Sequence, residues 1–380
     1  MATITDTMME STPSAQTPAA AGKTVTKEDR GYLDTSNGAV ADWAATEIRG
    51  DTDILASQAS SRVPFGDWRD QFFQKGYYVV KGAIPRERAD AYRQRMLDWF
   101  AKFDFGFDIN DKSTWVQEHL PKMMKGESSS TIAPPMRSGH GKSEALTAPL
   151  LSEPGVIEPF AQLWNTDELL VSFDAPNITL PGRTDVDGAP WPHVDQSPTR
   201  KGLVCVQGIV NLSPAGPNDG GLQLFTGSSE LFEQFFVEHP LQPKPEGAPG
   251  QVDWYGFTDA DVKWFTDRGC ERIKVEADPG DVIIWDSRTV HYSSQPASDV
   301  IRTIMYATYA PASLASPEDL ALKAELFKRY EGSTHWPHCN IWGQGKAMRD
   351  GKICSGEREE PLERPVVTDT VLKLAGLKSY

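Results

Sequence analysis

Two histidines, one aspartate and one arginine have the types and spacing of a metal centre with an adjoining anion site. His193 and Asp195 are separated by one residue, His291 lies 96 residues after Asp195 (291 − 195), and Arg302 lies 11 residues after His291 (302 − 291). On a strand, side chains alternate between faces, so His193 and Asp195 would point the same way. Two imidazoles and a carboxylate can bind Fe(II) on one face of an octahedron and leave three positions open. An arginine one strand away offers a planar fork for a carboxylate. The four residues therefore predict a metal site that also binds a dicarboxylic cosubstrate.

A His-x-Asp triplet alone carries little information, because a chain with 7 histidines can contain one by chance. The alternative interpretation of His193 is a polar strand residue that hydrogen-bonds a loop. The complete spacing favours the metal site, because His291 follows the apolar run 281–286 and Arg302 precedes the alternating run 303–309.

The region from Leu169 to Pro311 has the texture of an all-β domain. Short apolar runs alternate with Gly, Pro, Asn and Asp, which predicts a mainly β fold with flanking helices, a double-stranded β-helix (jelly roll, cupin-like). The long excursion 228–268 is predicted to stay outside the sheets as a lid or binding loop. The predicted strands are Leu169–Phe173, Asn177–Leu180, Trp191–Asp195, Leu203–Leu212, Leu222–Phe225, Glu271–Glu276, Asp281–Trp285 and Arg302–Tyr309.

Helices are predicted before and after this region. Trp68, Phe72 and Phe73 recur at helical spacing before Gly76, and a strand follows at 77–80. Further helices are expected from Pro85 to Phe103, Glu158 to Leu163, Glu230 to Phe236 and Ser316 to Tyr330, with a short piece at Val40–Ile48. The predicted organisation is a disordered tail (1–25), an N-terminal arm and helical support (26–168), a catalytic jelly roll (169–312), and a C-terminal helix with a wrapping tail (313–380).

Composition excludes several classes of partner. The formal charge is −15, from 38 basic and 53 acidic residues, and no basic cluster stands out, so neither nucleic acid nor a membrane surface is expected as a partner. No apolar segment reaches the roughly 18–20 residues of a bilayer span. The four cysteines lack a CxxC spacing and no targeting signal is visible, which favours a reducing cytoplasm. The sequence leaves the oligomeric state open and allows a homodimer.

These motifs resemble the phytanoyl-CoA dioxygenase-like (PhyH-like) branch of the Fe(II)/2-oxoglutarate oxygenases. The resemblance covers roughly residues 65–311. It includes the metal triad His193, Asp195 and His291, with Arg302 at the position of the 2-oxoglutarate anchor and Ser293 at that of its hydroxyl partner. Supporting segments are Phe72–Gly82, Gly220–Leu222, Gly227–Ser228 and Pro279–Asp281.

The resemblance implies Fe(II), 2-oxoglutarate and O2 as cofactor and cosubstrates. Oxidative decarboxylation of 2-oxoglutarate would give succinate and CO2 and supply the oxidant for hydroxylation, desaturation or ring formation on a small organic molecule, in specialised metabolism. The chain departs from the family at Ser229, where many members have histidine. The lack of basic patches argues against an acyl-CoA substrate, and Asp195, in place of a small residue, argues against halogenation. A protein hydroxylase and a non-catalytic jelly-roll metal-binding protein are the alternatives.

Further candidates flank these positions in the sequence. The strand after the triad motif could aim Gln207 at 2-oxoglutarate, and Asn177 is a comparable candidate. The competing role for both is a hydrogen bond in the core. Trp191, Gln196, Arg137 and Arg288 are candidate substrate contacts. Core packing competes for Trp191, and a surface salt bridge competes for each arginine.

The segment 334–340 contains two histidines and a cysteine, which suggests a second metal site. Pro337 breaks any helix that would align His335 with His338, so packing against the jelly roll is the preferred interpretation.

Overall fold

The computed structural model describes residues 64–103, 105–120, 131–132, 144–185, 189–241, 253–345, 348–349, 352–353 and 360–380. Within these ranges most strands belong to two antiparallel sheets. The larger sheet contains β1 (Tyr77–Val80), β2 (Thr131–Ile132), β3 (Leu169–Val171), β4 (Pro176–Thr179), β6 (Val206–Asn211), β10 (Val282–Asp286), β12 (Arg302–Tyr306) and β13 (Tyr309–Pro311). The smaller sheet contains β5 (His193–Val194), β7 (Gly221–Phe225), β8 (Tyr255–Gly256), β9 (Arg272–Lys274) and β11 (His291–Ser294).

The larger sheet has the order β1-β10-β6-β12-β4-β2, with β13 pairing both β3 and β6, and the smaller sheet has the order β8-β5-β11-β7-β9. The two sheets share a buried hydrophobic cluster that includes Ile209, Ile283 and Ile304 of the larger sheet and Leu222 and Leu224 of the smaller one. This confirms the predicted mainly β jelly-roll fold.

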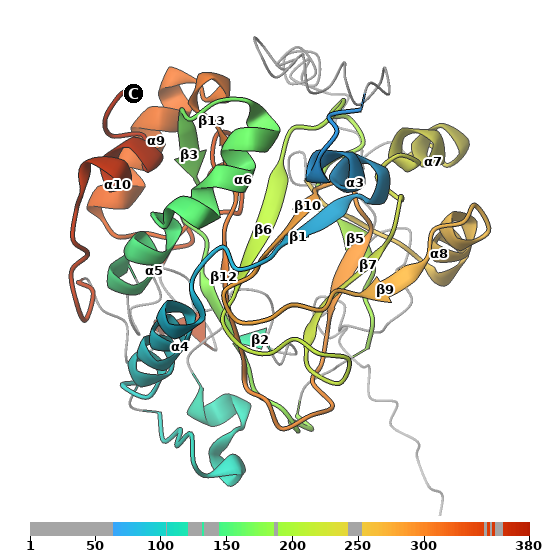
Figure 1. Ribbon diagram of the computed structural model, residues 1–380. Coiled ribbons are helices and arrows are strands. Elements are labelled where there is room, and N and C mark those ends of the chain that lie inside the picture. Colours follow the sequence, from blue (N-terminus) through green and yellow to red (C-terminus); the bar gives the residue numbers. More distant parts are fainter. Residues whose placement is uncertain are drawn as a thin grey trace, which may run out of the picture.

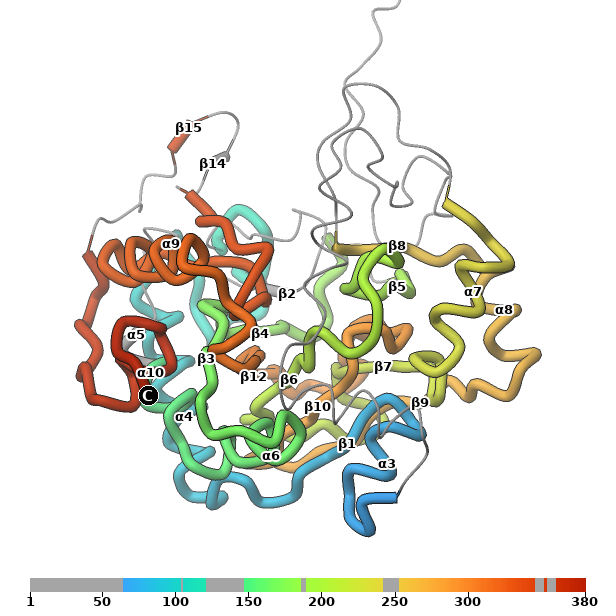
Figure 2. The backbone as a smooth tube through the Cα atoms, turned by 90° about the horizontal axis from the view of Figure 1, so that it is seen from above, coloured from blue at the N-terminus to red at the C-terminus, as the bar shows by residue number. Residues whose placement is uncertain are grey.

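Alternation along the strands of the larger sheet separates an inner face from an outer one. On β6, Ile209 joins the cluster between the sheets, whereas Val206 and Val210 pack into a second cluster on the opposite face. That outer cluster is completed by helices α4 (Arg86–Phe100), α5 (Glu144–Leu151) and α6 (Pro154–Trp164), which cover the sheet (Figures 1 and 2). Each strand therefore aims alternate side chains at the helices and at the interior.

The chain enters the sheet through α3 (Trp68–Lys75). Asp67 caps its first turn, and Gly76 ends it in the left-handed conformation at φ 80°, donating its backbone N–H to the Phe72 carbonyl. Strand β1 follows and pairs with β10. These observations confirm the predicted helix, its glycine end and the strand after it.

The remaining helices lie at opposite ends of the sandwich (Figure 2). Helix α9 (Pro317–Lys328) starts with a capping box of Ser316 and Asp319, as expected from a serine before proline. It lies on the same side of the molecule as α10 (Asp369–Leu374), and α7 (Phe232–Glu238) and α8 (Asp259–Thr266) lie on the other. The sequence did not predict α5, α8, α10, β8 or β11. A hairpin of β14 (Met348–Arg349) and β15 (Lys352–Ile353) and three single turns of 3-10 helix, at 112–114, 117–119 and 312–314, complete the described elements.

The insert differs from the prediction, because part of it joins a sheet. Strand β8 pairs with β5, the strand of the His-x-Asp motif. Behind this pair lies an aromatic cluster in which Phe235, Tyr255, Phe257 and Phe265 are fully buried. The expectation that the whole excursion stays outside the sheets is therefore wrong, since its end extends the smaller sheet next to the predicted metal ligands.

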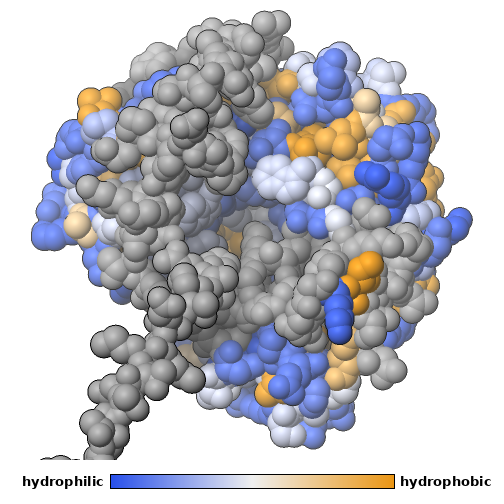
Figure 3. All heavy atoms as spheres, turned by 180° about the vertical axis from the view of Figure 1, so that it is seen from behind, coloured by the Kyte–Doolittle hydropathy of each residue, from blue (hydrophilic) through white to orange (hydrophobic). Residues whose placement is uncertain are grey.

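No helix among the described residues has both the length and the apolar character of a bilayer span. On the face seen in Figure 3, described residues are largely hydrophilic, with hydrophobic residues gathered in a few patches. The predicted tail 1–25, the helical piece Val40–Ile48 and Arg137 lie outside the described residues.

Candidate metal centre

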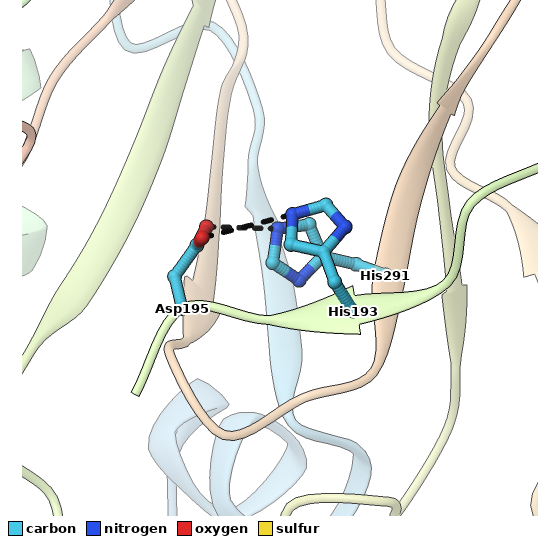
Figure 4. A group of neighbouring side chains, drawn as sticks. All are labelled: His193, Asp195 and His291. Atoms are coloured by element: carbon cyan, nitrogen blue, oxygen red, sulfur yellow. Dashed lines mark ion pairs between the residues drawn. The ribbon is translucent and has the colours of Figure 1, made fainter. Parts of the chain in front are cut away.

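Neighbouring strands of the smaller sheet bring the three predicted metal ligands together (Figure 4). His193 on β5 stands directly opposite His291 on β11, and Asp195 follows the end of β5. Asp195 Oδ1 lies 3.7 Å from His193 Nε2, and Asp195 Oδ2 lies 3.3 Å from His291 Nε2. Adjacent ligands about 2.1 Å from an octahedral metal lie about 3 Å apart. The three side chains therefore need to move little to bind one ion.

Backbone carbonyls select the nitrogen that each imidazole presents. Nδ1 of His193 lies 3.1 Å from the carbonyl oxygen of Trp191, and Nδ1 of His291 lies 2.8 Å from that of Thr289. If each Nδ1–H donates to its carbonyl, Nε2 carries the lone pair and faces Asp195. Burial, followed by the neighbouring His291, lowers the pKa of His193, which favours the neutral imidazole that a metal requires.

The carboxylate of Asp195 is oriented by the two imidazoles and by a residue of the opposite sheet. Burial raises the pKa of Asp195, but the interactions with His193 and His291 outweigh it and hold the pKa well below its ordinary value. The side-chain amide of Gln207 on β6 donates to Asp195 Oδ2 at 2.9 Å. Among the described residues, this triad is the one group of His, Cys, Asp or Glu with the proximity of a metal site.

Arg302 lies on the inner face of the larger sheet. It shares a face of β12 with Ile304, which belongs to the cluster between the sheets, and with Tyr306. The side chain is 3% exposed, and its Nε and Nη1 have no hydrogen-bond partner in the described part of the chain. Burial lowers the pKa of Arg302, and the hydrogen bond with Tyr306 opposes this shift. A buried guanidinium with unused donors fits a carboxylate ligand such as that of 2-oxoglutarate.

Asn177 lies on β4, which pairs with β12 so that Asn177 is opposite Ile304 and Thr179 is opposite Arg302. Its amide donates to the Tyr306 hydroxyl at 2.9 Å, and its carbonyl oxygen accepts from Thr179 at 3.1 Å. Sequence reasoning missed Tyr306, although its place four residues after Arg302 on one strand put both on the same face. Ser293 lies two residues after His291 on β11 and is half-buried. Contact of Asn177 and Ser293 with the cosubstrate remains a prediction.

The candidate substrate residues have different surroundings. The Trp191 indole stacks on His193, with ring centroids 4.1 Å apart and planes at 9°. Gln196 is fully buried, donates to the Gly202 carbonyl at 3.0 Å and accepts from Ser287 at 2.8 Å, so its amide is used within the protein. Arg288 forms a two-pronged pair with Asp286, at 3.0 and 2.6 Å, beside acidic residues of the α7 region. Trp191 therefore adjoins the centre, whereas the polar groups of Gln196 and Arg288 are engaged elsewhere.

The segment 334–340 adjoins the centre without forming a second cluster of metal ligands. His335 is among the groups that lower the pKa of Asp195. Trp336 is buried under the guanidinium of Arg200, at 4.5 Å from its ring centroid, and Arg200 in turn pairs with Asp253 at 2.6 Å. Burial lowers the pKa of His338 to about 3. This agrees with the packing interpretation of the segment.

The fold and the triad define a jelly-roll protein with a candidate 2-His-1-carboxylate metal centre. Residues 72–304 match the family model described as phytanoyl-CoA dioxygenase (PhyH). The chain is 43% identical over 296 residues to the Ava biosynthesis cluster protein O of Aspergillus versicolor, which covers 75% of this chain and 92% of that protein. The chain belongs to the phytanoyl-CoA dioxygenase (PhyH) family, and it is therefore a non-haem iron enzyme that uses 2-oxoglutarate and O2.

Solved structures similar to this chain include two with 2-oxoglutarate. The epimerase SnoN, in complex with Fe3+, alpha-ketoglutarate and nogalamycin RO, has 18% identity and a TM-score of 0.42, covering 68% of this chain and 84% of its own. EctD from S. alaskensis, with 2-oxoglutarate and 5-hydroxyectoine, has 15% identity and a TM-score of 0.43, covering 80% and 87%.

Proposed function

We propose that His193, Asp195 and His291 hold the iron, that Arg302 binds the distal carboxylate of 2-oxoglutarate, and that the enzyme oxidises a small molecule in the biosynthesis of a specialised metabolite. The observation that carries this proposal is the convergence of the triad with a buried, incompletely bonded arginine on the inner faces of the two sheets. The biosynthetic setting is supported by the relative from a biosynthesis cluster.

Iron, 2-oxoglutarate and O2 together supply an oxidant that removes hydrogen from a C–H bond, with release of succinate and CO2. The protein's residues position and shield this chemistry. Two neutral imidazoles and Asp195 would hold the iron and leave room for exchangeable ligands. Arg302, supported by Tyr306, orients the cosubstrate through its far end. The buried walls exclude water from the reacting groups.

The chemical outcome depends on where the substrate is held, so hydroxylation, desaturation and ring formation all remain within the proposal. Asp195 occupies the position that a halide would need, which argues against halogenation. We place the enzyme in the cytoplasm, a proposal supported by the buried free thiols of Cys205 and Cys270. The sequence allows a homodimer, and light scattering of the purified protein would test for it.

Iron-dependent formation of succinate from 2-oxoglutarate, measured with the full chain in the absence of substrate, tests this function. His193→Ala should lose iron and succinate formation together while its melting temperature stays close to that of the wild type. A wild-type protein that binds iron but forms no succinate would indicate a binding protein instead. Retained turnover in His193→Ala would remove His193 from the site.

A further inference from the structure

Trp254, in the insert, lies beside the metal centre. Its ring centroid is 6.1 Å from that of His193, and the two planes are inclined by 27°. Strand β8 places Gly256 directly opposite His193. Because side chains alternate along a strand, Trp254 and Gly256 share the face of His193, whereas Tyr255 points to the other face and is fully buried. Trp254 is only half-buried, so the residue keeps part of its surface exposed.

Gly256 provides the space in which this indole lies. A Cβ atom added to Gly256 would lie 2.5 Å from Cη2 and 3.1 Å from Cζ2 of Trp254. The backbone of Gly256 is not in the left-handed region, so its conformation does not demand glycine. The missing side chain instead lets the Trp254 ring fold across β8 towards His193.

A second indole lies against the same imidazole. Trp191 stacks on His193 and is also half-buried. Two indole faces therefore lie beside the imidazole of His193, and one of them, that of Trp191, packs against the aromatic cluster of the insert. Such faces stack favourably on flat unsaturated rings, and they gain from burying the apolar area that is still exposed.

We propose that Trp254 is the wall on which a flat, apolar ring of the substrate stacks beside the metal centre, and that Gly256 sets the position of this wall. This assignment rests on the proposed function, because it concerns the substrate of that same site. It gives part of the insert a role in substrate selection.

Two probes that differ in flatness test the assignment. The full chain, loaded with Co(II) and 2-oxoglutarate, is titrated with 2-naphthol and with decahydro-2-naphthol in a calorimeter. Wild-type protein should bind the flat probe about five-fold more tightly, a difference typical of aromatic stacking. Trp254→Leu and Gly256→Ala should each abolish this preference.

Trp264→Leu is the matched control. Trp264 belongs to α8 of the same insert, but its indole donates to Glu238 and lies under Arg268 at the surface, so the preference should persist. The double variant Trp254→Leu with Gly256→Ala should bind both probes like Trp254→Leu alone, because the added methyl group acts only through the indole. This comparison separates displacement of Trp254 from a general folding defect.

Substrate-free succinate formation is measured in every variant. Loss of the preference in Trp254→Leu, with the preference retained in Trp264→Leu, supports the assignment. An unchanged preference in Trp254→Leu, or no binding of either probe to an active wild-type enzyme, overturns it. A wild-type protein without iron-dependent succinate formation overturns the proposed function and this assignment with it.

Discussion

Replacing Arg302 with methionine should have opposite effects on cosubstrate binding and on the stability of the free protein. Arg302 is 3% exposed, and two of its guanidinium nitrogens lack hydrogen-bond partners among the described residues. Burial also lowers its pKa. In the free protein this charge is therefore poorly compensated, and a carboxylate ligand would complete its bonding.

The structure sets the size of both effects. Two charge-assisted hydrogen bonds contribute about 1.5–3 kcal/mol each. Arg302→Met should therefore weaken 2-oxoglutarate binding by about 3–6 kcal/mol, roughly 10²- to 10⁴-fold in Kd. In the free protein, removing this buried charge should raise the free energy of unfolding by about 1–3 kcal/mol. Loss of the hydrogen bond with Tyr306 should lower it by about 1 kcal/mol. The melting temperature should stay unchanged or rise by a few degrees.

Calorimetric titration of Co(II)-loaded protein with 2-oxoglutarate measures the first effect, and thermal unfolding without cosubstrate measures the second. Arg288→Met is the matched control, because Arg288 is paired with Asp286. That variant should lose about 3 kcal/mol of stability by leaving a buried carboxylate uncompensated, and it should bind 2-oxoglutarate as the wild type does. An Arg302→Met protein with unchanged 2-oxoglutarate affinity, or one destabilised as strongly as Arg288→Met, would refute the reasoning.

Three further outcomes are expected. Gln207→Met should weaken Co(II) binding about 10- to 100-fold, because the Asp195 carboxylate loses its hydrogen bond. The control Asn211→Leu removes a buried amide bonded to backbone carbonyls of the same region and should lower stability only. Equal Co(II) affinities of the two variants would contradict this. Burial lowers the pKa of Lys323 from its ordinary value of 10.5 to about 7. The buried ammonium group therefore destabilises the folded protein fully below about pH 7, progressively less as the pH rises, and not at all above pH 10.5. After allowance for the lost hydrogen bond to the Val171 carbonyl, Lys323→Met should stabilise the protein by about 3 kcal/mol at pH 6 and progressively less towards pH 10. Urea unfolding measures this gain, and a gain that does not vary with pH would exclude the mechanism. Arg200→Met should cost about 3 kcal/mol in the same assay by leaving the Asp253 carboxylate buried and unpaired, and an unchanged midpoint would show that the pair contributes little.

The centre was predictable because its geometry is mostly local. One intervening residue puts His193 and Asp195 on one side of the chain. The apolar run before His291 and the alternating run that begins at Arg302 mark β10 and β12 of the larger sheet, whereas His291 itself lies on the short strand β11, which the sequence did not predict. Alternation also explains why Arg302 and Tyr306 share the inner face.

Contacts across strands were less predictable, because they depend on register and on very short elements. Strand β8 has only two residues, too few for a periodic pattern, yet its pairing places the insert next to His193. Helix α8 did carry a sequence signal, the capping box of Thr258 and Asp261. Gln207 was expected to point inward, but its hydrogen bond to Asp195 follows from the approach of one sheet to the other.

The two imidazoles illustrate this division between local and distant control. Each Nδ1 faces the carbonyl oxygen of the residue two positions earlier, Trp191 for His193 and Thr289 for His291. The same local turn of the chain thus leaves Nε2 to face Asp195 in both histidines, without help from any distant residue. Orientation of the carboxylate and of the aromatic wall relies on partners from β6 and β8. Substitutions at Gln207 or Trp254 should consequently change how ligands are held while the choice of imidazole nitrogen, and with it the basic ability to bind a metal, persists.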